Sequence, residues 1–131
     1  MFDKYIIVGD EFKNVTENGT VTGFQIGERL PYYRGVFLAL VGKADLVVDG
    51  EHFSPDQITV TLHGNSYPLT ELASIMDDRW EFGEVGILTV KKPGGLQPGE
   101  HRVELTQTMD ISYVPSGMFV GRDAKVLELK G

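Results

Sequence analysis

"HRVELTQTMDISY", residues 101–113, is the stretch that decides the fold. Its apolar residues fall on one parity: Val103, Leu105, Met109, Ile111 and Tyr113. Its polar residues fall on the other: Arg102, Glu104, Thr106, Thr108, Asp110 and Ser112. Successive side chains of a β-strand point to opposite faces, so this alternation predicts a strand with one buried and one wet face. Gln107 is the exception on the apolar face, and Pro115 limits the strand's end.

The flanking sequence continues the strand pattern. "QITVTL" (57–62) and "TVTGFQIGERL" (20–30) alternate in the same way, and Asp49-Gly50 and Asn18-Gly19 stand between such runs. These dipeptides favour two-residue hairpin turns because both central residues need a positive φ. About eight short strands are expected, which is typical of an all-β fold. We therefore expect one domain over residues 1–131, a two-sheet antiparallel β-sandwich with one short helix.

The helix is predicted in "PLTELASIMDD", residues 68–78. Leu69, Leu72, Ala73 and Met76 recur at spacings of three and four residues, which is typical of one helix face. Thr70 is a plausible N-cap. About two helical turns are too short to be stable alone, so tertiary packing must hold this helix.

Composition excludes several kinds of partner. The chain has 131 residues and a formal net charge of -7. This charge argues against binding to a nucleic-acid backbone or to an anionic membrane surface. No apolar run approaches the roughly 20 residues of a membrane helix. The first residues, "MFDKYIIVGDEF", do not resemble a secretory signal, and there are no cysteines, so we expect a cytoplasmic protein.

"PYYRGVFLALVG", residues 31–42, departs from the alternating pattern. Residues 36–41 are apolar on both parities, which predicts a strand buried on both faces. A sandwich buries only one face of each sheet, so the short helix, a loop or another chain must cover the second face. Cover by the helix and cover by a partner stay open from the residues alone, although Tyr32, Tyr33, Arg34 and Trp80 are types that interfaces favour.

"DDRWEFG", residues 77–83, contains the single tryptophan of the chain and two acids. A glycosidase needs two carboxyl groups flanking one bond, and these normally come from separate elements. Adjacent Asp77 and Asp78 fit a helix end and a turn better, with Arg79 or Arg34 as a partner. Trp80 fits either a protein interface or a ring that stacks on a sugar.

Three histidines complete the candidate chemistry. His52 follows a turn and His101 begins a strand, so both are expected to be exposed. His63 could be a site residue, although a histidine beside a Gly-Asn turn is more often structural. No spacing indicates a metal site in this chain. The residues alone therefore predict no catalytic or metal-ligating set, and an enzyme using His63 with Asp77 or Asp78 stays a minor alternative.

An ordered set of motifs resembles a known family, the small β subunit of bacterial C-glycoside deglycosidases. The motifs are "FKNV", "ENG", "VTGF", "RLPYYRGVFLAL", "VDGE", "HGNSYPLTEL", "DDRWEFGE", "KPGGLQPGEHRVEL" and "ISYVP". The resemblance extends over residues 2–129. It implies a β-sandwich subunit that binds a larger α subunit, a TIM barrel related to sugar isomerases.

The resemblance also implies the chemistry. The complex is expected to cleave the carbon–carbon bond between a 3-oxo sugar and a flavonoid or other aromatic aglycone, a lyase reaction. The base and a divalent metal, for which manganese is expected, would lie in the α subunit, and this chain would hold no cofactor. The residues expected at the partner interface or site edge are Tyr32, Tyr33, Arg34, Val36, Leu38, Asp78, Arg79, Trp80 and Phe82. A free-standing immunoglobulin-like or carbohydrate-binding module is the alternative, with Trp80 stacking on a sugar.

Overall fold

The predicted central strand is present as β10 (Gly99–Asp110), between two antiparallel neighbours in a computed structural model. The structure describes residues 6–30, 35–75, 77–81, 83–110 and 118–129. Val103, Leu105 and Met109 are fully buried, as the alternation predicts, whereas Ile111 and Tyr113 lie outside the described residues. Gln107 is also buried, and its amide group donates a hydrogen bond to the Thr108 carbonyl.

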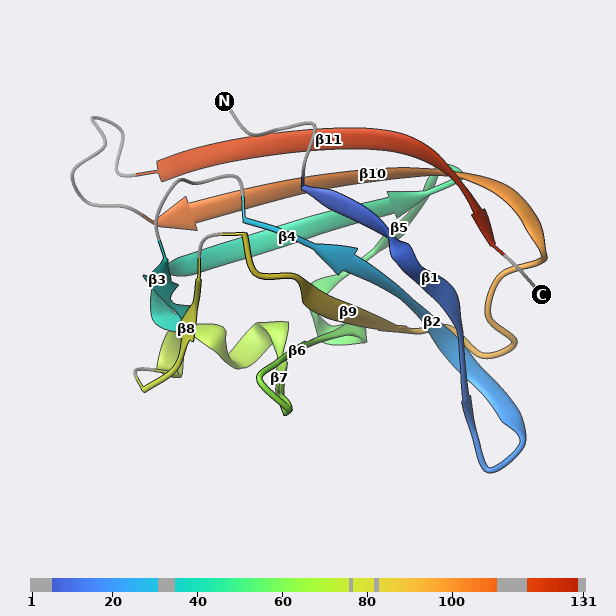
Figure 1. Ribbon diagram of the computed structural model, residues 1–131, viewed down its shortest axis with the longest axis horizontal. Coiled ribbons are helices and arrows are strands. Elements are labelled where there is room, and N and C mark those ends of the chain that lie inside the picture. Colours follow the sequence, from blue (N-terminus) through green and yellow to red (C-terminus); the bar gives the residue numbers. More distant parts are fainter. Residues whose placement is uncertain (1–5, 31–34, 76, 82, 111–117, 130–131) are drawn as a thin grey trace.

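Two antiparallel sheets form the layers, and a two-stranded ribbon closes one end (Figure 1). The first sheet has the order β1 (Ile7–Glu17), β2 (Thr20–Glu28), β9 (Gly86–Lys91), β6 (Ile58–Leu62) and β7 (Asn65–Pro68). The second has the order β11 (Met118–Leu129), β10, β4 (Val41–Val48) and β5 (Glu51–Phe53). The ribbon pairs β3 (Val36–Phe37) with β8 (Arg79–Trp80). The all-β, two-sheet antiparallel sandwich predicted from the sequence is confirmed.

One hydrophobic core fills the space between the sheets. Phe24 of the first sheet meets Phe53 of the second edge-to-face, with ring centroids 5.3 Å apart. Aromatic pairs prefer this geometry because the positive ring edge meets the negative face. No helix in the described part of the chain is long and apolar enough to cross a membrane.

The predicted hairpin turns are confirmed by their backbone geometry. Asp49 and Gly50 have φ values of 51° and 85°, and Asn18 and Gly19 have 52° and 80°. A third turn of the same kind joins β6 to β7, with positive φ at His63 and at the glycine after it. The sequence reading placed this turn one residue too late, at Gly-Asn. Its actual position sends the His63 side chain out from the tip of a hairpin.

The apolar run at residues 36–41 is not one strand, so the prediction of a strand buried on both faces is wrong. It divides into β3, the 3₁₀ helix η2 (Leu38–Leu40) and the start of β4. Val36, Leu38 and Val41 are buried, whereas Phe37 and Leu40 are exposed. The tight η2 turn breaks the period-two alternation, which is why apolar residues occur on both parities.

The short helix is the 3₁₀ helix η4 (Leu69–Ser74). It follows Pro68, which occupies the N-cap position in place of the predicted Thr70. Its buried residues are Leu69 and Leu72, and a spacing of three matches the three residues per turn of a 3₁₀ helix. The residue after η4, Ile75, accepts a backbone hydrogen bond from Ala39 of η2. A further 3₁₀ helix, η3 (Pro55–Gln57), leads into β6.

Candidate partner-binding site

The described residues of the predicted interface gather at one end of the sandwich. Val36, Leu38, Asp78, Arg79 and Trp80 all belong to or adjoin β3, η2 and β8, on the left of Figure 1. We call this region the β3–β8 end. The other four predicted residues, Tyr32, Tyr33, Arg34 and Phe82, lie outside the described residues. Whether the β3–β8 end meets another protein stays a prediction.

Trp80 belongs to the core of the chain, with only 1% of its surface exposed. Its indole N–H donates a 2.8 Å hydrogen bond to the Glu84 carbonyl, and its ring packs against Gly86. A Cβ added at Gly86 would lie 2.7 Å from the Trp80 ring, so the glycine makes room for the tryptophan. The proposed role of Trp80 as a platform for stacking a sugar is therefore wrong.

Val36 and Leu38 are likewise buried within this chain. Val36 pairs with Trp80 in the two-stranded ribbon, and the Leu38 N–H donates to the Asp78 carbonyl at 3.0 Å. These residues hold the end together from the inside and present no side-chain surface to a partner. A partner at the β3–β8 end would therefore contact other side chains than Val36 and Leu38.

Among the described residues, the large apolar side chains exposed at this end are Phe37 and Leu40, with 44% and 43% of their surface exposed. The Arg79 guanidinium carbon lies 4.8 Å from the centre of the Phe37 ring, a cation–π contact. The same guanidinium donates to the Gly35 carbonyl at 3.0 Å and approaches Glu81 at 3.4 Å. Phenylalanine and arginine are both enriched at protein interfaces relative to the rest of the surface. The sequence reading missed Phe37 and Leu40 because it treated residues 36–41 as one strand.

Asp78 is part of a hydrogen-bonded cluster and not of a carboxylate pair. It accepts 2.6 Å and 2.8 Å hydrogen bonds from the Tyr67 hydroxyl and the Arg79 backbone N–H. The Tyr67 hydrogen bond is the main reason that the pKa of Asp78 lies below its ordinary value. The Arg79 guanidinium pairs with Glu81 in place of the predicted Asp78, and Asp77 is exposed. Two adjacent acids of this kind cannot flank a glycosidic bond.

His63 completes the cluster from the tip of the β6–β7 hairpin. Its Nε2 lies 3.1 Å from the Arg79 carbonyl, and its Nδ1 lies 3.1 Å from a Glu84 carboxylate oxygen. The Arg79 carbonyl and the ionised Glu84 carboxylate can only accept hydrogen bonds, so both ring nitrogens of His63 must donate. This requirement favours the imidazolium form. The hydrogen bond to Arg79 is the main cause of the raised pKa of His63, and the charges of Glu84 and Asp78 add to it. An imidazolium is a poor general base, which weakens the reading of His63 as a catalytic residue.

No metal-binding cluster occurs among the described residues: no group of three His, Cys, Asp or Glu side chains could hold an ion. The residues present therefore do not fit a metal centre in this part of the chain. His52 is exposed as predicted, and its ring approaches Asp45 at 3.5 Å.

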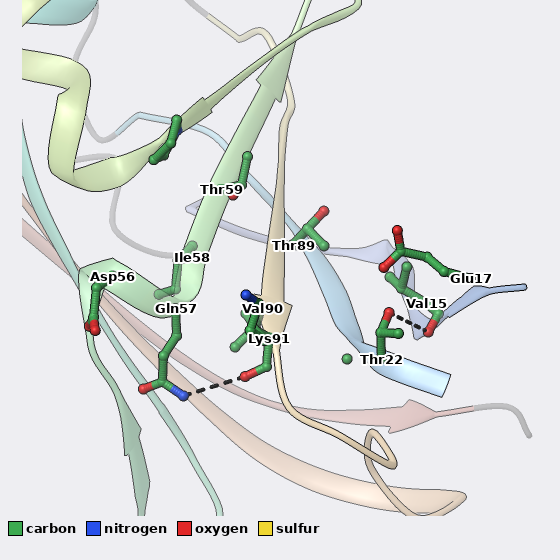
Figure 2. A pocket seen from close by; sticks show the side chains of 12 residues that line it. Val15, Glu17, Thr22, Asp56, Gln57, Ile58, Thr59, Thr89, Val90 and Lys91 are labelled. Atoms are coloured by element: carbon green, nitrogen blue, oxygen red, sulfur yellow. Dashed lines mark hydrogen bonds between the residues drawn. The ribbon is translucent and has the colours of Figure 1, made fainter. Parts of the chain in front are cut away.

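A shallow trough crosses the outer face of the five-stranded sheet (Figure 2). Its volume is about 440 Å³, within the range of small-molecule sites. Thr22, Thr59 and Thr89 lie on its floor from three neighbouring strands, with Gln57 and Lys91 along one side. The trough offers hydroxyl, amide and ammonium groups together with the carboxylates of Glu17 and Asp56, which suits a polar ligand.

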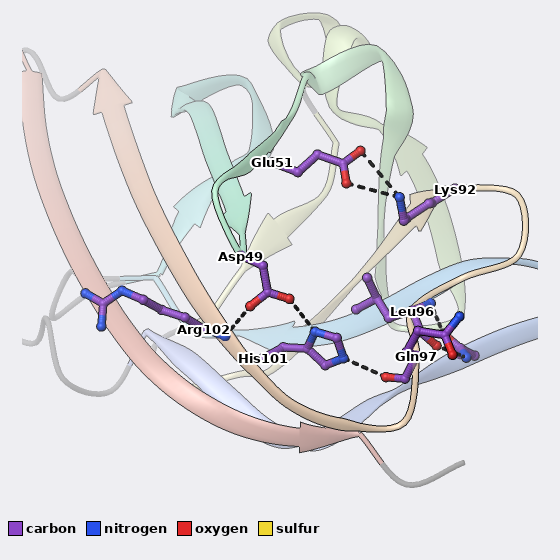
Figure 3. Close-up of polar contacts among 8 residues, drawn as sticks. Asp49, Glu51, Lys92, Leu96, Gln97, His101 and Arg102 are labelled. Carbon is purple, nitrogen blue, oxygen red and sulfur yellow. Dashed lines mark hydrogen bonds and ion pairs between the residues drawn. The ribbon is translucent and has the colours of Figure 1, made fainter.

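His101 is buried, contrary to the prediction that it is exposed (Figure 3). Its Nδ1 lies 2.5 Å from an Asp49 carboxylate oxygen and its Nε2 lies 2.6 Å from the Gln97 carbonyl. Both partners accept, so His101 is held as an imidazolium. Burial lowers the pKa of His101, but the hydrogen bonds to Gln97 and Asp49 outweigh it and the pKa is raised. The pair fixes the Asp49-Gly50 turn to the start of β10, so its role is structural.

The fold and the β3–β8 end define a class: a small antiparallel β-sandwich with exposed aromatic and aliphatic side chains gathered at one end. Residues 2–113 match the family of C-glycoside deglycosidase beta subunits, so the chain belongs to that family and the resemblance seen in the motifs is confirmed. The chain is 39% identical over 114 residues to the C-glycoside deglycosidase beta subunit of Eubacterium cellulosolvens, covering 86% of this chain and 78% of that protein. It is 34% identical over 116 residues to the 3'-dehydrocarminate deglycosidase beta subunit of a Microbacterium species, covering 88% and 83%.

Proposed function

We propose that this chain is the accessory, non-catalytic β subunit of a cytoplasmic, heteromeric C-glycoside deglycosidase. The observation that carries the proposal is the family match over residues 2–113. The two relatives are both named beta subunits, and a beta subunit has at least one other subunit as its partner. The partner in this proposal is a TIM-barrel α subunit related to sugar isomerases.

The proposed reaction is an elimination on a 3-oxo C-glycoside of a flavonoid or another aromatic aglycone. The ketone acidifies the neighbouring C–H bond, a base removes that proton, and the bond to the aglycone breaks with its electron pair leaving on the aglycone. Protonation of the aglycone gives the free aromatic compound and an unsaturated keto sugar. The base belongs to the α subunit, as does a divalent metal, for which manganese is expected and which would stabilise the enolate when bound. No step is assigned to a metal in this chain.

The part of this chain in the complex is structural. The β3–β8 end offers exposed Phe37 and Leu40, with the Arg79 guanidinium packed on the Phe37 ring. If these two side chains were truncated or replaced by charged ones, a partner bound here would lose its apolar contacts. We place the contact with the α subunit here, which is also where the described residues of the predicted interface lie.

The test is co-expression with a TIM-barrel α subunit of a C-glycoside deglycosidase. Size-exclusion chromatography with light scattering measures assembly, and release of the aglycone from a 3-oxo C-glycoside measures activity. We expect a stable complex that is active only when both chains are present. A chain that stays monomeric beside the barrel, or a barrel with full activity alone, would contradict the proposal.

A second function is favoured by one observation, the polar trough on the first sheet (Figure 2). It suits a glycoside-binding module, the alternative considered from the sequence, although Trp80 takes no part in it. The two functions are distinguished by an NMR titration of the chain alone with methyl β-glucoside. Shifts confined to Thr22, Thr59 and Thr89 would support the module.

A further inference from the structure

Glu28 is an acid in the core without a partner. It is the last residue of β2 and lies on the inward face with Ile26 and Phe24, two and four residues earlier. Only 1% of its surface is exposed, and neither carboxylate oxygen has a hydrogen-bond partner, alone among the buried side chains that the structure describes. Buried carboxyl groups are normally hydrogen-bonded, because desolvating one without compensation is costly.

The position of Glu28 links it to the predicted interface. Across the ladder it pairs with Gly86 of β9, the residue against which the Trp80 ring packs. The other ladder neighbour of Glu28 is Ile7. Ile7 and Gly86 are the first residues of their strands and Glu28 is the last residue of β2, so Glu28 lies where these three strands end. In the sequence it precedes Tyr32, the first of the residues predicted at the partner surface, by four positions.

The charged groups on neighbouring elements form hydrogen bonds and ion pairs with residues other than Glu28. The Lys125 ammonium of β11 donates to the Ile7 carbonyl at 2.8 Å and contacts Asp123 at 3.0 Å. Arg79 of β8 bonds Gly35 and Glu81, and the Glu84 carboxylate pairs with His63. Arg29 follows Glu28 in the chain, so its side chain starts toward the opposite face. Burial therefore acts alone on Glu28 among the described residues and raises its pKa to about 8, which leaves the carboxyl mostly neutral at pH 7.

We propose that Glu28 receives its missing partner from the α subunit: on assembly, a basic side chain of that subunit enters beside the β3–β8 end and pairs with the Glu28 carboxylate. This inference rests on the proposed function. Two unsatisfied oxygens on one carboxyl group suit a guanidinium or ammonium group, which can donate to both. A neutral donor would leave the second oxygen unsatisfied and the carboxyl protonated.

The pairing has a proton balance that can be measured. The carboxyl is mostly protonated in the isolated chain and ionised in the complex, so its proton passes to the buffer on binding. The association constant should then increase by up to about tenfold per pH unit until the pH reaches the pKa of the isolated chain. A hydrophobic contact without an ion pair would show no such dependence.

The experiment is isothermal titration calorimetry of this chain into the purified α subunit at pH 7, in phosphate and in Tris. These buffers differ in ionisation enthalpy, so the difference between the two measured enthalpies counts the protons released. The wild-type chain is compared with Glu28→Gln, which keeps the size of the side chain but cannot ionise. The matched control is Glu17→Gln, an exposed glutamate at the opposite end of β1.

We expect the wild-type chain and Glu17→Gln to release close to one more proton than Glu28→Gln, and Glu28→Gln to bind at least about tenfold more weakly. A wild-type complex that forms without proton release, or with the same release and affinity as Glu28→Gln, overturns the inference and leaves the proposed function intact. If the wild-type chain does not bind the α subunit at all, the proposed function fails and this inference fails with it. Should Glu28→Gln not fold, the buffer comparison on the wild-type chain decides the question alone.

Discussion

Glu28 affects the stability of the isolated chain through its protonation. Its pKa is about 8 in the folded state against 4.5 when solvated, so between these values the folded chain holds a proton that the unfolded chain has lost. The free energy of unfolding should therefore fall as the pH rises from about 5 to 8, by up to about 1.4 kcal/mol per pH unit, and level off above pH 8.

Glu28→Gln should remove this dependence. The amide has no charge to desolvate, so the variant should be more stable than the wild type at pH 8, by on the order of 4 kcal/mol, and nearly equal to it at pH 5. Urea unfolding at pH 5, 6.5 and 8 measures the difference, with Glu17→Gln as the exposed control. Equal pH profiles for the wild type and Glu28→Gln would show that the carboxyl is already ionised and paired in the isolated chain.

His101 also makes the stability depend on pH, because its hydrogen bonds stabilise the cationic form of the ring. Its pKa is raised, so its contribution to stability is complete below the ordinary histidine value near 6.5 and is lost as the pH rises through the folded pKa. His101→Gln should lower the free energy of unfolding by about 1 to 3 kcal/mol at pH 6, and by less at pH 9. Thermal unfolding at the two pH values tests this, with exposed His52→Gln as the control. A loss that is the same at both pH values would mean that His101 acts through packing alone.

The burial of two polar residues, His101 and Glu28, was not predicted from the sequence. The burial of His101 depends on Asp49, 52 residues earlier in the chain, and on the Phe12 ring, 6.0 Å away centre to centre. No local pattern carries these long-range contacts. Glu28 had a signal, because it falls on the inward parity with Phe24 and Ile26, but a charged residue at a strand end is ordinarily assigned to the surface.

Among the elements, β10 was predictable and the β3–η2–β4 segment was not. β10 keeps period-two alternation across the described strand, and its register against β4 and β11 follows from which face is apolar. Residues 36–41 contain a 3₁₀ turn whose period is three, and an apolar run of six residues gives no clue to where a turn divides it. The sequence therefore pointed to Val36 and Leu38, which are buried, and not to Phe37 and Leu40, which are exposed.

The pairing of β2 with β9 depends on Gly23. A Cβ at this position would stand 1.9 Å from the Val90 carbonyl oxygen, a backbone atom that cannot move without separating the strands. Gly23→Ala should therefore lower the free energy of unfolding by about 3 kcal/mol or more. Gly19→Ala is the matched control: its φ is +80° but nothing lies near its Cβ, so it should cost only about 1 kcal/mol. Chemical denaturation compares the two, and equal losses would mean that the β2–β9 ladder adjusts to the added methyl group.

At the scale of the whole molecule, the two ends of the sandwich differ in what they offer. The end with the Asn18-Gly19 hairpin and the Asp49–His101 pair is closed by turns and ion pairs within the chain (Figure 3). At the β3–β8 end Phe37 and Leu40 are exposed, and the buried, unpaired Glu28 lies in the adjoining core. A buried acid without a partner and exposed apolar side chains are both exceptions to ordinary folding rules. Such exceptions tend to occur at functional sites. This asymmetry is the physical reason to expect assembly through one end only.

Assembly should accordingly fail when Phe37 is charged, without loss of the fold. Phe37→Glu places a carboxylate on an exposed position beside the Arg79 guanidinium, so the chain should unfold at nearly the wild-type temperature. It would replace the apolar ring with a charge that the α subunit must desolvate, which should weaken binding by at least about 30-fold. Charges at Val36 or Leu38 would instead disrupt this chain's own core and could not separate folding from binding. The control is Val126→Glu, a side chain 57% exposed on β11 and far along the second sheet. Co-purification with the α subunit and thermal unfolding of each variant are the measurements. If Phe37→Glu assembles at wild-type stoichiometry while Val126→Glu does not, the partner lies on the outer face of the second sheet and the β3–β8 end is not the interface.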